Sequence, residues 1–119
     1  MNETIFGFGC MRLPQKDDKN PKSINQELFN QMVDYYMSKG FNYFDTSFAY
    51  HDGCSETAIK EAIVKRYPRD SYLIADKIPT WLLKEYDDNQ KYVDIMLERL
   101  EIDYFTDYLY IISMNHGIN

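Results

Sequence analysis

Apolar and polar residues form two kinds of block along the chain. Short blocks rich in aromatic and β-branched residues, ending at polar or turn-forming residues, have the pattern of strands. They cover residues 5–14, 41–50, 71–79 and 103–114. Longer blocks place apolar residues three and four positions apart, as amphipathic helices do. They cover residues 24–40, 55–68 and 89–102. Because the two kinds alternate, the sequence predicts three strand–helix units followed by a fourth strand.

The predicted helices carry signals at their ends and along one side. Ser23 and Gln26 form a capping-box pattern before the first helix, and Gly40 stands where a glycine often ends a helix. Ser55 is a candidate N-cap for the second helix, and Pro68 is its stop signal. The apolar stripe of the first helix is expected to comprise Leu28, Met32, Tyr35 or Tyr36, and Lys39. That of the third is expected to comprise Val93, Met96, Leu97 and Leu100.

Strands that alternate with helices predict an α/β fold with a parallel sheet. Residues 41–50 (FNYFDTSFAY) alternate poorly and are rich in aromatics, which indicates a strand buried on both faces. Flavodoxin-like sheets and TIM barrels both use such units. A dinucleotide-binding Rossmann fold fits less well, because GFGCMR at residues 7–12 lacks the G-x-G-x-x-G pattern and precedes a polar loop.

Composition indicates one small globular domain covering residues 1–119. The chain is 45% hydrophobic and 27% charged, so it has enough apolar residues to build a core. Its formal net charge of −6 argues against nucleic acid or an anionic membrane as a partner. Apolar runs are far shorter than the ~20 residues of a membrane span.

The cysteines and histidines indicate the cellular compartment and whether a metal site is expected. Cys10 and Cys54, in a chain with no leader pattern, give no sign of secretion or of a disulfide framework, so we expect a cytoplasmic protein. The two histidines have no second ligand at helical spacing, and no metal site is predicted.

Three residues that could carry chemistry follow predicted strands. Asp45 and Tyr50 follow the second strand, and Lys77 lies at the end of the third. Because the C-terminal ends of parallel strands share one face, we expect the Lys77 amine within about 4 Å of both the Asp45 carboxylate and the Tyr50 hydroxyl. A lysine ammonium beside a phenol favours the phenolate, and an aspartate beside the lysine keeps it charged and oriented. The tyrosine is then a usable general acid for reducing a carbonyl.

Each of these residues also has a purely structural interpretation. Asp45 could cap a turn, Tyr50 could be one of many packing aromatics, and Lys77 could be a solvated loop residue. Only their convergence would distinguish a site from three separate surface residues.

Four segments resemble the successive N-terminal blocks of aldo-keto reductases, in the same order and at similar spacing. They are GFGCMRLP at 7–14, GFNYFDTSFAYHDGCSETAIKEAI at 40–63, SYLIADKIP at 71–79 and LERLEIDYFTDYLYI at 97–111. The D-x-x-x-x-Y pattern followed by S-E is the most specific of these features. The resemblance implies a (βα)₃β half of a (β/α)₈ TIM barrel, with helices outside the parallel sheet. It also implies reduction of a small carbonyl substrate with NADPH.

The resemblance implies roles for individual residues as well. Tyr50 would donate a proton, Lys77 would favour its phenolate, and Asp45 would pair with Lys77. Met11 and Arg12, together with Asp45, would contact the nicotinamide end of the cofactor; Cys10 precedes them at the end of the first strand.

Two departures from the family pattern shape our expectations. The family's fourth strand typically ends in a histidine that hydrogen-bonds the substrate carbonyl. Here that position falls on Ile112, or on Ile111 if no gap is allowed, and His116 lies further on. Isoleucine cannot donate a hydrogen bond, so polarisation of the carbonyl is expected to be lost. The chain also stops after the fourth strand, whereas a complete barrel usually needs about 250 residues.

These departures define a main hypothesis and two alternatives. The main hypothesis is a truncated N-terminal half of an aldo-keto reductase, inactive by itself, whose barrel is completed by a partner chain or by self-association. The chain could instead be a non-catalytic remnant or interaction module that keeps the half-barrel fold. It could also be a small flavodoxin-like ligand-binding domain, which a strand order of 2-1-3-4 would favour.

Overall fold

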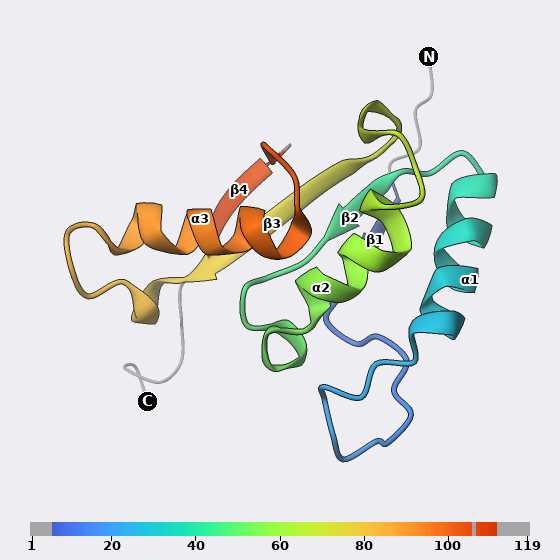
Figure 1. Ribbon diagram of the computed structural model, residues 1–119, viewed down its shortest axis with the longest axis horizontal. Helices are drawn as coiled ribbons and strands as arrows, with labels where there is room; N and C mark the ends of the chain where they lie inside the picture. The colour runs from blue at the N-terminus through green and yellow to red at the C-terminus, as the bar shows by residue number, and fades with distance from the viewer. Residues whose placement is uncertain (1–5, 106, 112–119) are drawn as a thin grey trace.

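The computed structural model describes residues 6–105 and 107–111 of the chain. Its strands form one parallel sheet in the order β1-β2-β3-β4 (Figure 1). These strands are β1 (Gly7–Gly9), β2 (Tyr43–Asp45), β3 (Leu73–Pro79) and β4 (Asp107–Ile111). The helices between them are α1 (Gln26–Ser38), α2 (Ser55–Ile59) and α3 (Asp88–Leu100). A π-helical turn, Lys60–Val64, extends α2.

The strand order decides between the two α/β architectures. A sequential order confirms the predicted (βα)₃β half barrel and excludes the 2-1-3-4 order of a flavodoxin-like sheet. β1 is shorter than the apolar block that predicted it, because only Gly7–Gly9 pairs with β2.

The helices cover one face of the sheet. In Figure 1, α2 and α3 lie in front of the strands. α1 packs on the same side, where the Phe29 and Tyr36 rings contact the ring of Phe8 on β1. Phe8 and Phe44 are partners in the strand register, and the Phe44 side chain is 0% exposed. The hydrophobic core therefore lies between the helices and this face.

The opposite face of the sheet is largely uncovered by the described part of the chain. Tyr43 and Asp45, on either side of Phe44, are only half-buried. Successive side chains of a strand point to opposite faces, so the two residues lie on the face away from the helices. The expectation that this strand is buried on both faces is wrong for this chain, because all three helices pack on the same side.

The stripe that α1 buries shares only Tyr36 with the predicted one. Its fully buried residues are Phe29, Val33 and Tyr36, whereas Leu28 is 42% and Tyr35 is 67% exposed. Both stripes are apolar at helical spacing. The aromatic rings of β1 and β2 contact Phe29 and Tyr36, so tertiary packing selects this side of the helix.

The helix ends also differ in detail from the sequence prediction. Asn25, not Ser23, caps α1, and its side chain accepts a hydrogen bond from the Leu28 N–H at 3.2 Å. Gly40 follows the helix with a φ of +90°, as predicted for a terminal glycine. Ser55 is the first residue of α2 rather than its cap. In α3, Met96 and Leu100 of the predicted stripe are buried.

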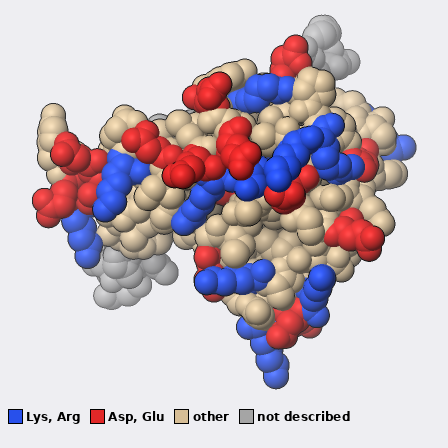
Figure 2. All heavy atoms as spheres, in the orientation of Figure 1, with Lys and Arg blue, Asp and Glu red and all other residues tan. Residues whose placement is uncertain are grey.

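Charged residues of both signs are interspersed over the helical side of the molecule (Figure 2). Such a mixture is typical of a solvated surface. Within the described ranges, no helix has both the length and the apolar character needed to cross a membrane. The described residues also contain no group of three or more His, Cys, Asp or Glu side chains arranged to hold a metal ion.

Candidate active site

The strand register brings Asp45 and Lys77 together on the uncovered face of the sheet. Asp45 pairs with Ala75 of β3, and Lys77 lies two residues further along, so both side chains point to the same face. The Lys77 Nζ donates a hydrogen bond to the Asp45 carboxylate, forming a salt bridge. The Lys77 side chain is 14% exposed and that of Asp45 is 42% exposed. The ammonium group is thus mostly enclosed, while its carboxylate partner reaches solvent.

Tyr50 lies over the same lysine. The Lys77 Nζ is 5.2 Å from the centroid of the Tyr50 ring, within the range of a cation–π contact. The structure thus brings the three predicted side chains into one cluster, and Lys77 contacts both of the others. The closer approach of the amine to the Tyr50 hydroxyl, within about 4 Å, stays a prediction.

The segment after β2 reaches Tyr50 by continuing along β3. The Thr46 N–H donates to the Ala75 carbonyl at 2.9 Å, and the Phe48 N–H donates to the Lys77 carbonyl at 3.0 Å. These bonds extend the parallel pairing past the end of the regular strand. They hold the segment against the backbone of Lys77 itself, so the positions of Tyr50 and Lys77 are linked.

A buried hydroxyl ties the strand ends to α2. The Ser55 hydroxyl is hydrogen-bonded to the Thr46 hydroxyl at 2.8 Å and donates to the Cys10 carbonyl at 3.1 Å. Ser55 and Thr46 are both 0% exposed. This network fixes the start of α2 to the ends of β1 and β2, and its burial explains why Ser55 does not act as a helix cap.

His51 anchors the Tyr50 segment on its other side. The Leu13 N–H donates to His51 Nε2 at 2.8 Å, which requires Nε2 to be unprotonated. Nδ1 therefore carries the proton and donates it to the Pro21 carbonyl, also at 2.8 Å. The sequence contained no signal for this role beyond the position of the histidine directly after Tyr50.

Arg99 of α3 also holds this segment. Its Nη1 donates to the Phe48 carbonyl at 3.2 Å and to the Glu56 carboxylate at 3.0 Å. Its guanidinium carbon lies 4.3 Å from the centroid of the Phe48 ring. Gly53 makes room for it, since a Cβ there would lie 3.3 Å from Nη1. Glu56 and Arg99 fall in two different predicted helices, and no sequence pattern pairs them.

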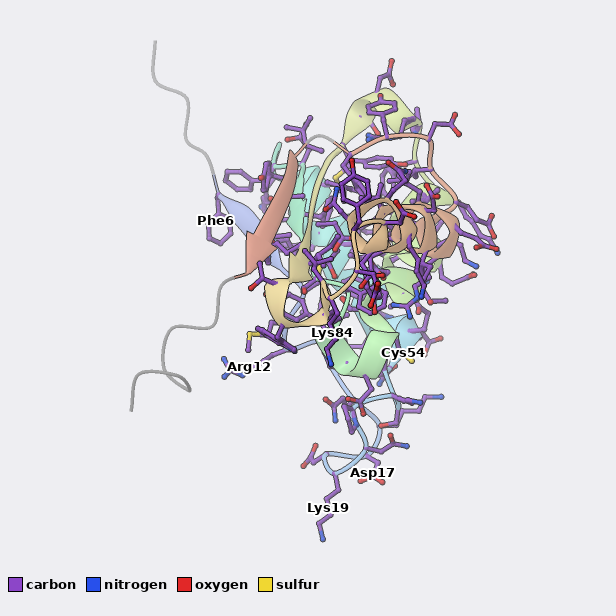
Figure 3. All side chains as sticks on the ribbon, turned by 90° about the vertical axis from the view of Figure 1, so that its left-hand side faces the viewer. Phe6, Arg12, Asp17, Lys19, Cys54 and Lys84 are labelled. Atoms are coloured by element: carbon purple, nitrogen blue, oxygen red, sulfur yellow. The ribbon has the colours of Figure 1, made fainter. Side chains whose placement is uncertain are left out.

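The other predicted cofactor positions lie at the end of β1. The Cys10 N–H donates to the Asp45 carbonyl at 2.8 Å, and burial raises the pKa of the Cys10 thiol far above its ordinary value. Met11 is 54% exposed, and Arg12 is exposed and projects outwards in Figure 3. Asp45 therefore belongs to the cluster with Lys77, while Met11 and Arg12 face solvent.

The predicted carbonyl-binding positions cannot be placed in this way. Ile112 and His116 lie outside the described residues, and for Ile111 the structure describes the backbone strand alone.

A comparison with protein families decides the assignment of the chain. The model of the aldo/keto reductase family matches residues 6–115. The chain belongs to the aldo/keto reductase family. No curated protein sequence gives a significant match.

Solved structures of aldo-keto reductases share the fold of this family member. One from Bacillus halodurans, in its holo form, is 26% identical with a TM-score of 0.67, and the match covers 87% of this chain and 34% of that protein. One from Klebsiella pneumoniae, in complex with NADPH, is 23% identical with a TM-score of 0.67, over 87% and 34% of the two chains. One from Bombyx mori, in complex with NADP, is 21% identical with a TM-score of 0.63, over 89% and 33%. The chain thus spans about a third of the length of these reductases.

Proposed function

We propose that this chain supplies the proton-donating half of an NADPH-dependent carbonyl reductase site. The observation that carries the proposal is the Asp45–Lys77 salt bridge with the Tyr50 ring beside it, at the C-terminal edge of a parallel half barrel. Active sites of (β/α)₈ barrels are built at that edge. Membership of the aldo/keto reductase family and likeness to reductases with bound NADPH or NADP support the choice of reaction.

The residues around Asp45 fit one end of the cofactor. Gly9 is the register partner of Asp45, and a Cβ built on it would meet nothing within 4 Å. The surface beside the Asp45 carboxylate is therefore open enough for a flat ring to approach the backbone. Asp45 offers hydrogen-bond acceptors there, and Met11 offers exposed apolar surface. We assign the nicotinamide end to these residues, with Arg12 nearby in sequence, and the other contacts to the part of a barrel that this chain does not span.

The chemistry divides between the cofactor and this chain. When bound, NADPH supplies the hydride that reduces the carbonyl carbon. The Tyr50 hydroxyl donates its proton to the carbonyl oxygen, and the Lys77 ammonium stabilises the resulting phenolate by charge. Asp45 orients the Lys77 ammonium through their salt bridge. The substrate class is a small aldehyde or ketone.

We further propose that a partner chain or a second copy completes the barrel. β1 and β4 are the edges of the described sheet, and unpaired parallel edges are sites of strand addition. A groove of about 640 Å³ adjoins β1 and is lined by apolar side chains of α1 and its neighbours. Among these, Phe6 is 58% and Tyr35 is 67% exposed.

Cys10 and Cys54 are free thiols, which supports placing the protein in the reducing cytoplasm.

A chimera tests the proposed chemistry directly. The 119-residue chain would replace the matching third of the Bacillus halodurans reductase, with which it shares 26% identity and a TM-score of 0.67. We expect the chimera to bind NADPH and to reduce simple aldehydes. Its rate should lie about 10²–10³-fold below that of the parent, because the carbonyl-polarising histidine is replaced.

Paired variants assign the proton donor in that chimera. Tyr50→Phe should abolish measurable turnover and leave NADPH fluorescence titrations unchanged, because it removes one hydroxyl. Tyr86→Phe is the matched control, since Tyr86 is 99% exposed. A chimera that binds NADPH and turns over equally well with Phe at position 50 would refute the role of Tyr50.

A further inference from the structure

Two fully buried carboxyl groups lie between the sheet and the helices. Asp76 and Glu56 are each 0% exposed. Asp76 precedes Lys77 on β3 and so points to the opposite face, toward the helices. Glu56 is in the first turn of α2. The Glu56 carboxyl is close enough to Asp76 to raise the pKa of the aspartate.

The hydrogen bonds around this pair leave one carboxyl oxygen of each side chain without a partner in the described part of the chain. Asp76 Oδ1 accepts from the Lys77 N–H at 2.8 Å, and Glu56 Oε1 accepts from Arg99 Nη1 at 3.0 Å. The remaining oxygens, Asp76 Oδ2 and Glu56 Oε2, are buried and have no donor among the described residues. Two ionised carboxylates cannot hydrogen-bond to each other, whereas a single proton between them would satisfy both oxygens.

We propose that Glu56 and Asp76 share one proton, and that this bridge makes Asp76 a positioning residue for Lys77. The inference rests on the role proposed above for Lys77. The bridge completes a continuous chain of contacts from Arg99 on α3, through Glu56 on α2, to Asp76 and the backbone N–H of Lys77 on β3.

The charges around the pair show what loss of the proton would do. Arg99 faces Glu56 from α3, and Lys77 with its partner Asp45 lies across β3 and β2. Cys10, after β1, is close enough for its thiol to respond to the charges of Asp45, Lys77 and Asp76. With the proton present, the pair carries one negative charge opposite Arg99. Without it, two negative charges would repel each other in a buried site and displace the strand end that carries Lys77.

The environment of Asp76 favours its protonated form. Burial is the largest cause, followed by the hydrogen bond to Glu56 and then its charge, and together they raise the pKa of Asp76 to about 10. The Lys77 N–H and ammonium oppose this rise. An aspartate in the unfolded chain loses its proton near pH 4. Between these two values the folded chain holds a proton that the unfolded chain releases, so folding becomes less favourable as the pH rises through this window.

Amide variants test the bridge through the pH dependence of folding. Asp76→Asn keeps an acceptor for the Lys77 N–H and gives Glu56 a permanent donor. Glu56→Gln keeps an acceptor for Arg99 and gives Asp76 a permanent donor. Urea unfolding from pH 6 to 9 should show the folding constant of each variant rising about tenfold per pH unit relative to the wild type. Asp70→Asn, at an exposed aspartate, is the control and should run parallel to the wild type. Parallel curves for all three variants would refute the shared proton.

Carbon-13 NMR of the wild-type chain tests the positioning role. The Asp76 Cγ should show the chemical shift of a protonated carboxyl at pH 7 and titrate at alkaline pH. The Lys77 Cε should show a step with the same midpoint, absent from Asp76→Asn. An ionised Asp76 at pH 7, or a Lys77 Cε profile unchanged in Asp76→Asn, would overturn the proposal. Neither measurement involves NADPH or a carbonyl compound, so a failed reductase chimera would leave these results interpretable.

Discussion

At the scale of single residues, the segment carrying Tyr50 is held by backbone geometry that few sequences allow. His51 and Asp52 have φ values of 54° and 52°, and Gly53 has a φ of 92°. Three successive left-handed residues are costly for side chains other than glycine. Here His51 compensates through its hydrogen bonds to Leu13 and Pro21, and Gly53 admits the Arg99 guanidinium. The strain is therefore concentrated directly beside the proposed proton donor.

Two glycines allow the cost of left-handed backbone to be separated from the cost of a clash. Gly40 has a φ of +90° with open space around it, whereas Gly53 has a φ of +92° with Arg99 at 3.3 Å. Gly40→Ala should lower the free energy of unfolding by about 1 kcal/mol. Gly53→Ala should cost clearly more, because the Arg99 contacts to Phe48 and Glu56 must also shift. Equal losses in urea unfolding would show that Arg99 adapts without cost.

Removing the His51 ring should leave the backbone N–H of Leu13 without its hydrogen-bond acceptor. In His51→Ala, the buried Leu13 N–H loses its acceptor, and we expect about 1–3 kcal/mol of destabilisation. Hydrogen exchange should show faster exchange of the Leu13 amide, well before that of α1. Asp70→Ala, at an exposed position, is the control. Unchanged Leu13 exchange in His51→Ala would mean that the histidine does not anchor this segment.

At the scale of helices and strands, the sequence predicted the types and order of the elements better than their faces. Alternation of apolar blocks was enough for (βα)₃β, and Asp45, Tyr50 and Lys77 followed from the rule that parallel strands end on one edge. The prediction of the buried stripe of α1 was correct only at Tyr36, because two apolar stripes exist on that helix and only the aromatic rings of the sheet choose between them. The Asp76–Glu56–Arg99 contacts could not be predicted, since they depend on three elements packing at once.

Neighbouring residues of α1 provide a direct test of the buried stripe. Phe29 is 0% exposed and packs on Phe8, whereas Leu28 is 42% exposed. Phe29→Ala should reduce the free energy of unfolding by about 3–5 kcal/mol, through lost burial and the cavity left behind. Leu28→Ala should cost less than about 1 kcal/mol. A larger loss from Leu28→Ala, measured by urea unfolding, would mean that α1 is rotated or that its exposed stripe is covered in solution.

At the scale of the whole molecule, the uncovered face and the edges of the sheet are what distinguish this chain from a closed barrel. A closed barrel hides its inner strand faces and has no edges, whereas here β1 and β4 are edges and Asp45 on the inner face is 42% exposed. The groove beside β1 adds apolar surface to one of these edges. The features that leave the candidate site open are therefore the ones to which the proposed second half barrel would bind.

Exposed apolar surface at the β1 edge should make the chain associate. We expect sedimentation velocity to show a concentration-dependent species heavier than the monomer. Phe6→Lys should weaken this association, because Phe6 is 58% exposed at the groove and its side chain points outwards in Figure 3. Trp81→Lys is the matched control, since Trp81 is 50% exposed but not part of the groove lining. Equal weakening by both variants would indicate non-specific association.

The activity of the chain by itself should be limited because it spans only about a third of the length of these reductases. Hydride transfer needs the cofactor held in a fixed orientation to the carbonyl, and such positioning can supply about 7–11 kcal/mol of the barrier. This chain spans about a third of the reductases that it resembles, 34% in the case of the NADPH complex from Klebsiella pneumoniae. The sequence also has isoleucine where the family's oriented donor to the carbonyl oxygen is expected, and loss of such a donor typically costs about 10²–10³ in rate.

We therefore expect the purified 119-residue chain to show no measurable NADPH-dependent reduction of simple aldehydes, while it keeps the Asp45–Lys77 salt bridge. NADPH fluorescence titration would measure binding, and loss of NADPH absorbance with an aldehyde present would measure turnover. Both should be repeated across the concentration range in which the chain associates. Saturable binding with turnover that rises with association and disappears in Tyr50→Phe would contradict this expectation, because it would show that two copies of this chain rebuild the missing half.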